Sequence, residues 1–226
     1  MNIDPQFAVI LDAGHGGQDP ETGHYYTAPR KQFDHGRGEF HRKSIFQEGV
    51  FNRIITNELA KVLQFNRGIR VFYLHHEYLD LSLELRVAKA WEIYNQFPKA
   101  IGISNHANAS LDHNASGWEV FTSPGTTKSD YLAELMYEEA VEQIGNELPI
   151  RTDPWSDGDA DKEARFQILM QTPNPFVLVE NAFFDHLRDA QLLMDPKFRA
   201  RLVGVQQRAI WNYMITNKLV DHSPAA

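Results

Sequence analysis

Two histidines and two glutamates stand where this sequence can most easily carry chemistry. His15 lies in the glycine-rich stretch VILDAGHGGQD, directly after a short apolar segment. His106 follows a second apolar segment in ISNHANAS, and Glu180 ends a third in PFVLVENAFFDH. Glu48 opens an amphipathic stretch, EGVFNRIITNELAKVLQF. Each of these side chains can bind a metal ion or transfer a proton, so they are candidates for one shared site.

The glycines around His15 do not form a phosphate-binding loop. A dinucleotide fingerprint needs the spacing G-x-G-x-x-G, which Asp19 breaks after Gly14 and Gly16. The Gly-Lys-Ser/Thr of a P-loop does not follow either. Two hydrolase signatures are also absent, because GISNH lacks the final glycine of a nucleophile elbow and no H-E-x-x-H occurs. The sequence therefore favours a metal ligand over a phosphate-binding turn.

The elements that must position these residues alternate along the chain. Short segments rich in β-branched and aromatic residues alternate with segments whose apolar residues follow helical spacing. This order predicts an α/β fold, a mostly parallel twisted sheet with helices on both faces in a three-layer domain. Strands are predicted at 7–11, 69–74, 100–104, 117–122 and 175–180, and helices at 48–65, 81–97, 129–145 and 195–215.

Such a sheet would bring the candidate residues together. Ligands bind to open α/β sheets at the carboxyl ends of the strands, and His15, His106 and Glu180 each follow or end a predicted strand. Glu48 begins the first predicted helix and can point toward the same edge. Two imidazoles and a carboxylate suit zinc with water in the fourth position, and a second carboxylate could move that water's proton. A zinc hydrolase site is the prediction.

Composition and charge narrow the partners. The 226 residues include 22 basic and 30 acidic side chains, a net charge of −8, which argues against nucleic acid as the main partner. Cysteine is absent, so any metal must be bound by nitrogen and oxygen ligands. No apolar segment has membrane-spanning length, and the N-terminal residues lack the basic start and the long apolar run of a signal peptide.

Four motifs in fixed order connect these observations to a known family. They are LDAGHGG, QEGVFN, ISNHANAS and PFVLVENAFFDH, and together they resemble the zinc-dependent N-acetylmuramoyl-L-alanine amidases of the amidase-3 family. The likeness extends from about residue 7 to about residue 213, and LELRVAKA and GWEVFTS also look like segments of that family. It implies one catalytic domain over residues 1–226, with a fold of the zinc-exopeptidase or phosphorylase/hydrolase type.

The resemblance also implies a role for each candidate residue. His15, Glu48 and His106 match the positions that bind zinc in the family, and Asn52 completes the E-x-x-x-N motif that Glu48 opens. Glu180 matches the catalytic glutamate, which ends the last core strand before the pair Ala-Phe. Zn²⁺ is therefore the expected cofactor.

Alternatives remain open for several residues. Glu39 competes with Glu48 as the ligand, although no asparagine lies four residues after it. Glu180 could instead be a strand-end carboxylate paired with an arginine. Asp12 either orients a ligand through a hydrogen bond or simply ends its strand, and Arg86 is predicted to be structural.

Two further regions receive weaker predictions. His75 and His76 follow a predicted strand and are expected on the surface. Residues 18–44 are rich in glycine, histidine, arginine and tyrosine and are predicted to form an irregular loop. Long loops in compact domains are more often functional than idle, so this loop is a candidate for substrate contact.

The activity implied by the resemblance is hydrolysis of the amide between N-acetylmuramic acid and the L-alanine that opens the stem peptide. Zinc would activate water, Glu180 would move its proton, peptidoglycan would be the substrate, and a monomer is expected. The rivals are a zinc peptidase or deacylase of a small amidated metabolite, and a wall-binding module without catalysis. A phage-type endolysin would be cytoplasmic until release, and a bacterial enzyme with its leader removed would be periplasmic or extracellular.

Overall fold

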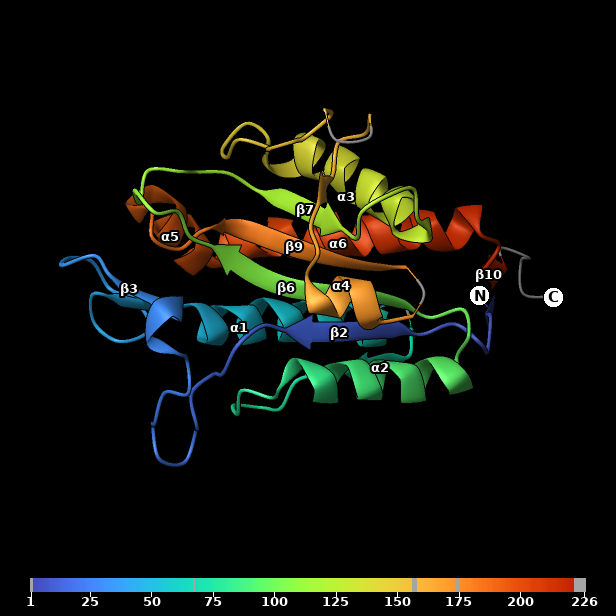
Figure 1. Cartoon of the computed structure of the whole chain (residues 1–226), viewed down its shortest axis with the longest axis horizontal. Coiled ribbons are helices and arrows are strands. Elements are labelled where there is room, and N and C mark those ends of the chain that lie inside the picture. The colour runs from blue at the N-terminus through green and yellow to red at the C-terminus, as the bar shows by residue number, and fades with distance from the viewer. Residues whose placement is uncertain (1, 67, 156–157, 174, 222–226) are drawn as a thin grey trace.

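A six-stranded sheet runs through the structure in the order β5-β2-β6-β9-β7-β8 (Figure 1). The structure is a computed structural model that describes residues 2–66, 68–155, 158–173 and 175–221. All neighbouring strands pair in parallel except β7 and β9, which are antiparallel. The strands are β2 (Val9–Ala13), β5 (Val71–Tyr73), β6 (Ile101–Asn108), β7 (Glu119–Thr122), β8 (Lys162–Glu163) and β9 (Phe176–Phe183).

Helices cover both faces of this sheet, as Figure 1 shows. One apolar core joins one face of the sheet to α1 (Glu48–Lys61), α3 (Lys128–Ile144), α5 (Leu187–Met194) and α6 (Pro196–Thr216). A second core joins the other face to α2 (Leu83–Gln96) and α4 (Gln167–Gln171). Helical spacing explains the packing of α1, because Phe51, Ile55 and Leu59 lie four residues apart and are all fully buried.

The predicted fold class is confirmed, and each predicted strand and helix has a counterpart in the structure. Of the long helices, α2, α3 and α6 begin at a residue whose side chain caps them. Thr127 and Asp130 form a capping box at the start of α3, and the side chain of Asp195 caps α6. Among the described residues, no helix is long and apolar enough to cross a membrane.

Several short elements were not predicted. The pair β1 (Asn2–Ile3) and β10 (Val220–Asp221) joins the two ends of the described chain. The helix predicted over 48–65 is continuous with a π-helical turn, η2 (Val62–Asn66), at the end of α1. Elements of two to five residues show no usable hydrophobic period, and they depend on contacts made by the folded chain. The short helices α4 (Gln167–Gln171) and α5 (Leu187–Met194) were not predicted either.

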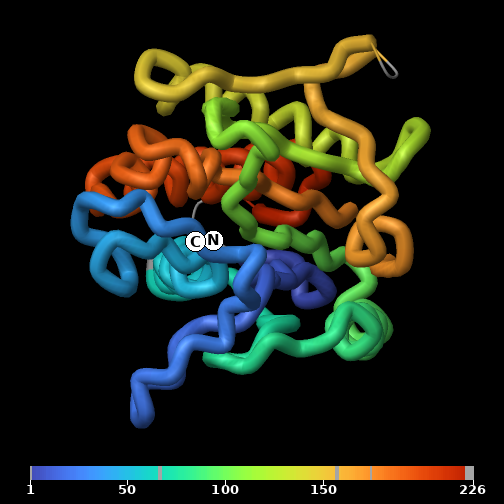
Figure 2. The backbone as a smooth tube through the Cα atoms, turned by 60° about the vertical axis from the view of Figure 1, so that its left-hand side comes forward, coloured from blue at the N-terminus to red at the C-terminus, as the bar shows by residue number. Residues whose placement is uncertain are grey.

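The segment 18–44 is more ordered than the irregular loop predicted from the sequence. It contains a one-turn 3-10 helix, η1 (Pro29–Lys31), followed by β3 (Gln32–Asp34), which pairs with β4 (Ile45–Gln47). Figure 2 shows this part of the chain, in blue, looping out after β2 and returning to enter α1. The prediction missed the hairpin because each of its strands has only three residues.

Strand register places the candidate residues at one edge of the sheet. Ala13 at the end of β2 is opposite Asn105 in β6, and His106 in β6 is opposite Glu180 in β9. Neighbouring strands are about 4.8 Å apart, so paired residues are adjacent. In Figure 1 these strand ends and the segment that holds β3 lie on the same side of the molecule.

Candidate metal centre

The turn after β2 delivers His15 to this edge. β2 is fully buried, and the chain then leaves the sheet at Gly14. His15 has a left-handed backbone with φ of 63°, a conformation in which histidine is enriched among non-glycine residues. Its Nε2 atom is buried and has no hydrogen-bond partner among the described residues. An orphaned imidazole nitrogen at a strand end is the environment of a metal ligand.

Two glycines allow this turn to pack against its neighbours. A Cβ atom added to Gly14 would lie 2.0 Å from Cε1 of His106. A Cβ atom added to Gly49, in the first turn of α1, would lie 1.9 Å from the carbonyl oxygen of Gly16. The side chain is missing at both positions because the turn, β6 and α1 approach each other closely.

Glu48 is held at the first position of α1 and is completely buried. Asn52, one helical turn later, donates from Nδ2 to Gly14 O at 3.0 Å and to Glu48 Oε1 at 3.3 Å. The backbone N–H of Ala107 donates to the same oxygen at 3.4 Å. Asn52 therefore connects α1 to the turn after β2 and holds the Glu48 carboxylate in place. This role explains why an asparagine stands one helical turn after Glu48.

The three predicted ligands converge. Glu48 Oε1 lies 3.1 Å from His106 Nδ1 and 3.4 Å from His15 Nε2. One donor atom from each of the three residues lies within 4.8 Å of the other two. The alternative ligand, Glu39, is exposed and outside this cluster. Two nitrogen donors and one oxygen donor at this spacing fit a zinc ion whose remaining position is open.

The ionisation of the cluster suits a cation. Burial lowers the pKa of His15 to about 4, so its imidazole is neutral and able to bind a metal. Burial raises the pKa of Glu48, but the hydrogen bond from His106 and the charges around it outweigh this effect and lower the pKa to about 2. A neutral imidazole and an ionised carboxylate are the forms in which these side chains bind metal.

Glu180 lies beside the cluster on the neighbouring strand, opposite His106 in the register. Its Oε2 atom is buried without a hydrogen-bond partner among the described residues, which does not support the alternative of a carboxylate paired with an arginine. Burial raises its pKa well above the ordinary value, and the charge of Glu48 raises it further. A carboxyl group with a raised pKa beside a metal site can both accept and donate a proton.

A comparison with known protein families decides the identity of this fold and site. The model of the family described as N-acetylmuramoyl-L-alanine amidase, amidase-3, matches residues 9–212. This chain belongs to that family. Membership gives the chain a peptidoglycan amidase function, in which the bond that is cut joins N-acetylmuramic acid to L-alanine, and it does not favour the two rival functions.

Solved structures of three bacterial amidases share the fold. The catalytic domain of CwlV from Bacillus (Paenibacillus) polymyxa var. colistinus is 22% identical, with a TM-score of 0.69 over 92% of this chain and 98% of that chain. AmiC2 of Nostoc punctiforme is 20% identical, with a TM-score of 0.71 over 94% and 99%. Ami1 from Mycobacterium smegmatis is 20% identical, with a TM-score of 0.69 over 96% and 100%.

A buried ion pair supports the turn that carries His15 in this amidase. Arg86 on α2 donates from Nη1 to Asp12 Oδ1 at 2.5 Å and to Ala13 O at 2.7 Å. Ser104 Oγ donates to the other oxygen of Asp12 at 2.8 Å. Arg86 is therefore structural, as predicted, and Asp12 anchors the end of β2 to α2 and β6.

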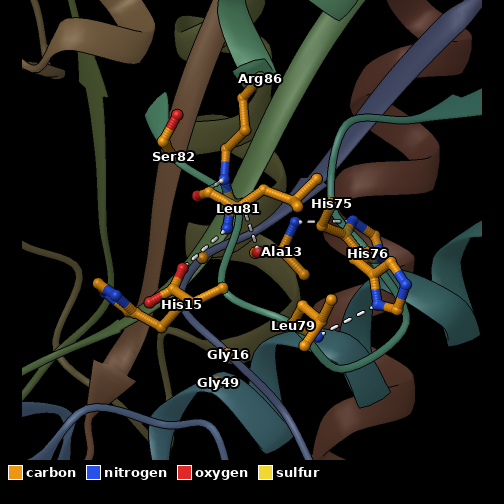
Figure 3. A network of polar contacts seen from close by, with 12 residues as sticks. Ala13, His15, Gly16, Gly49, His75, His76, Leu79, Leu81, Ser82 and Arg86 are labelled. Carbon is orange, nitrogen blue, oxygen red and sulfur yellow. Dashed lines mark hydrogen bonds and ion pairs between the residues drawn. The ribbon is translucent and has the colours of Figure 1, made fainter. Parts of the chain in front are cut away.

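His75 also supports the end of β2, so its predicted surface position is wrong. It is buried, and its Nδ1 atom accepts a hydrogen bond from Ala13 N at 3.1 Å. Figure 3 shows Arg86 and His75 approaching Ala13 from different sides, with His15 further along the turn. Local sequence patterns do not reveal this role, because β2 and β5, the strand before His75, pair only in the folded sheet.

The cluster of His15, Glu48 and His106 borders a cavity of about 450 Å³. His15 and His106 line one part of its wall, and Leu81, Leu83 and Ile168 line an apolar part. A cavity of this size, with a few polar groups at one end, is typical of a site for a small ligand or for part of a larger one. It leaves the imidazoles of His15 and His106 accessible to a ligand.

One further residue beside the cluster was not predicted. Lys31 Nζ lies 3.3 Å from Glu48 Oε2, on the oxygen opposite to the one that faces the imidazoles. Lys31 belongs to η1, within the segment that the sequence predicts to be irregular.

Proposed function

We propose that this amidase is zinc-dependent, with His15, Glu48 and His106 as the protein ligands and Glu180 as the catalytic acid–base. The observation that carries the proposal is the convergence of one carboxylate oxygen and two imidazole nitrogens within 4.8 Å, with Nε2 of His15 buried and without a hydrogen-bond partner among the described residues. Cysteine is absent, so the donor set consists of nitrogen and oxygen, as in many catalytic zinc sites.

The chemistry divides between the ion and the protein. A bound zinc ion would polarise the amide carbonyl and make a nearby water more acidic. Glu180 accepts the proton of the attacking water and then donates it to the nitrogen of the departing L-alanine. The water oxygen bonds to the carbonyl carbon, the carbon–nitrogen bond breaks, and the muramoyl carboxylic acid and a free amine are released. Asn52 keeps Glu48 in place throughout by its two hydrogen bonds.

Purified peptidoglycan tests the activity directly. We expect the protein to release new L-alanine amino termini without new reducing sugar ends, measured by amino-group labelling and a reducing-sugar assay on the same digest. A metabolite hydrolase would leave the polymer intact, and a wall-binding module would sediment with it unchanged. Either result would contradict the amidase function.

Removal of the metal provides a separate test of zinc dependence. Chelation is expected to lower the rate of peptidoglycan cleavage by about 100-fold or more, and added zinc should restore it. Zinc at about 100 times its dissociation constant should also raise the melting temperature of the chelated protein by about 5–10 °C, since a ligand specific for the folded state contributes about 2.7 kcal/mol at this ratio.

The matched variants for this test are His15→Ala and His24→Ala. His24 is exposed and lies outside the cluster, so its variant should keep the zinc-dependent rise in melting temperature. His15→Ala should lose it. A rise of equal size in both variants would show that zinc binds elsewhere.

A further inference from the structure

The hairpin formed by β3 and β4 places Lys31 beside the metal ligand Glu48. The observed register pairs Gln32 with Gln47 and Phe33 with Phe46 in antiparallel fashion. The next pair in the same register is Lys31 with Glu48, where the hairpin opens into η1 on one side and α1 on the other. The hairpin therefore brings the backbones of these two residues near each other, and their side chains complete the contact.

Side-chain contacts fix this register. Gln47 Nε2 donates to Gln32 Oε1 at 2.7 Å across the open end of the hairpin. Ser44 Oγ donates to Asp34 Oδ1 at 2.6 Å near the other end. Ahead of η1, Thr27 is buried and its Oγ1 donates to the carbonyl oxygen of Gly16 at 2.6 Å. The chain on both sides of Lys31 is thus tied either to the metal turn or to the strand that leads into α1.

The ammonium of Lys31 contacts the Glu48 carboxylate on the oxygen that does not face the imidazoles. Its Nζ lies 3.3 Å from Glu48 Oε2, whereas Oε1 of the same carboxylate faces His15 and His106. The Lys31 side chain is 38% exposed and that of Glu48 is 0% exposed, so Lys31 stands between the buried ligand and solvent. The charge of Lys31 also acts on Glu180. Lys31 therefore places a positive charge close to both carboxylates of the proposed site.

We propose that Lys31 is a further residue of the active site, whose ammonium group binds the negatively charged oxygen that forms when water adds to the scissile carbonyl. This inference rests on the proposed function. As the water oxygen bonds to carbon, the π electrons of the carbonyl move onto its oxygen, and Glu180 takes the proton of the water. When the carbon–nitrogen bond breaks, the electrons return to the carbonyl and Glu180 gives the proton to the amine.

The charges at the site favour a cation there in addition to the proposed zinc ion. Glu48 and Glu180 are both acidic, and the whole chain has a net charge of −8, so a lysine would offset their effect on a developing negative oxygen. A lysine on a flexible four-carbon side chain can follow that oxygen while its backbone stays fixed by the hairpin. Fixed positive groups aimed at developing charge are among the largest contributions to catalysis.

The test compares Lys31→Met, Lys31→Arg and Arg30→Met in the zinc-loaded protein. Arg30 is exposed on the same turn of η1, so its variant removes the same charge away from the cluster. With a soluble N-acetylmuramoyl-L-alanyl peptide, we expect Lys31→Met to lower kcat by about 100-fold and to change KM by less than about threefold. Lys31→Arg should recover kcat to within about tenfold of the wild type. Arg30→Met should match the wild type.

Binding measurements separate this role from a merely structural one. A phosphinate analogue of N-acetylmuramoyl-L-alanine carries a tetrahedral centre with a negative oxygen, and Lys31→Met should weaken its binding by about the same factor as kcat/KM falls. Zinc affinity, measured by competition with a chelator, should stay within about threefold of the wild type.

Three outcomes would overturn the proposal. They are an unchanged kcat in Lys31→Met, unchanged binding of the phosphinate, or a loss of zinc affinity that accounts for the whole loss of activity. The last result would make Lys31 only a counter-ion of Glu48. Failure of the proposed function itself looks different, because the wild-type protein would then leave the soluble amide uncut.

Discussion

Glu180→Gln is expected to lower kcat by about 1,000-fold while the variant still binds about one zinc ion per chain. Glutamine has nearly the same shape but cannot take the proton of water or return it to the departing amine. Glu180 is not in the group of donor atoms around Glu48, so the cluster itself stays intact. The rate is measured on a soluble N-acetylmuramoyl-L-alanyl peptide, and the metal by elemental analysis of the same sample.

Glu39→Gln is the matched control for this prediction. Glu39 is exposed and lies between β3 and β4. From the sequence alone, it remained an alternative ligand to Glu48. Its variant should keep both wild-type turnover and wild-type zinc content. A fully active Glu180→Gln protein would remove Glu180 from the mechanism. A Glu180→Gln protein without zinc would instead show that this glutamate belongs among the ligands.

The sequence predicted the cluster because its members are attached to regular elements. His15, His106 and Glu180 follow or end strands that are apolar enough to be recognised, and parallel strands end at a common edge. Glu48 begins a helix whose apolar spacing is clear. The placement of these four residues therefore follows from the fold class and needs no detailed knowledge of loops.

The sequence could not predict the role of Lys31, whose position depends on a hairpin of three-residue strands. Neither strand is long enough to show alternation, and the pairing of Gln32 with Gln47 is a contact across 15 residues. A signal was present in the turn-forming Gly36 and Gly38, which both have positive φ and lie between the two strands. That signal indicates a hairpin but leaves its register open.

The contacts that support the turn after β2 could not be predicted from the sequence either. Arg86 was predicted to be structural, but nothing in the sequence paired it with Asp12, 74 residues away. His75 was expected on the surface, yet it is buried and hydrogen-bonded to Ala13. Contacts of this kind can be predicted only when the order of strands in the sheet is known. Local sequence patterns do not contain that order.

Arg86→Met is expected to lower the free energy of unfolding by about 3–5 kcal/mol, because it leaves the Asp12 carboxylate buried without its cation. Arg86 and Asp12 are each only 2% exposed, so solvent cannot replace the lost interaction. The carbonyl oxygen of Ala13 loses a hydrogen bond in the same step. Urea unfolding followed by circular dichroism measures the change. Arg37→Met, which removes an exposed arginine, is the control and should differ from the wild type by less than about 0.5 kcal/mol.

The pH dependence of this loss identifies its cause. Burial raises the pKa of Asp12, but the charge of Arg86 and the hydrogen bond from Ser104 outweigh it and hold the pKa below its usual value of about 3.8. The wild type therefore keeps this stabilisation above about pH 4 and loses it as the pH falls further. In Arg86→Met we expect burial to raise the pKa of the Asp12 carboxyl group, because the arginine charge is gone. Acid then protonates this group and removes the cost of a buried, unpaired charge. The stability gap between the two proteins should be largest near neutral pH and shrink on acidification.

The double variant Asp12→Asn with Arg86→Met should regain part of the lost stability at neutral pH, because it removes both charges of the pair. A double variant as unstable as the sum of both single changes would contradict the ion-pair explanation.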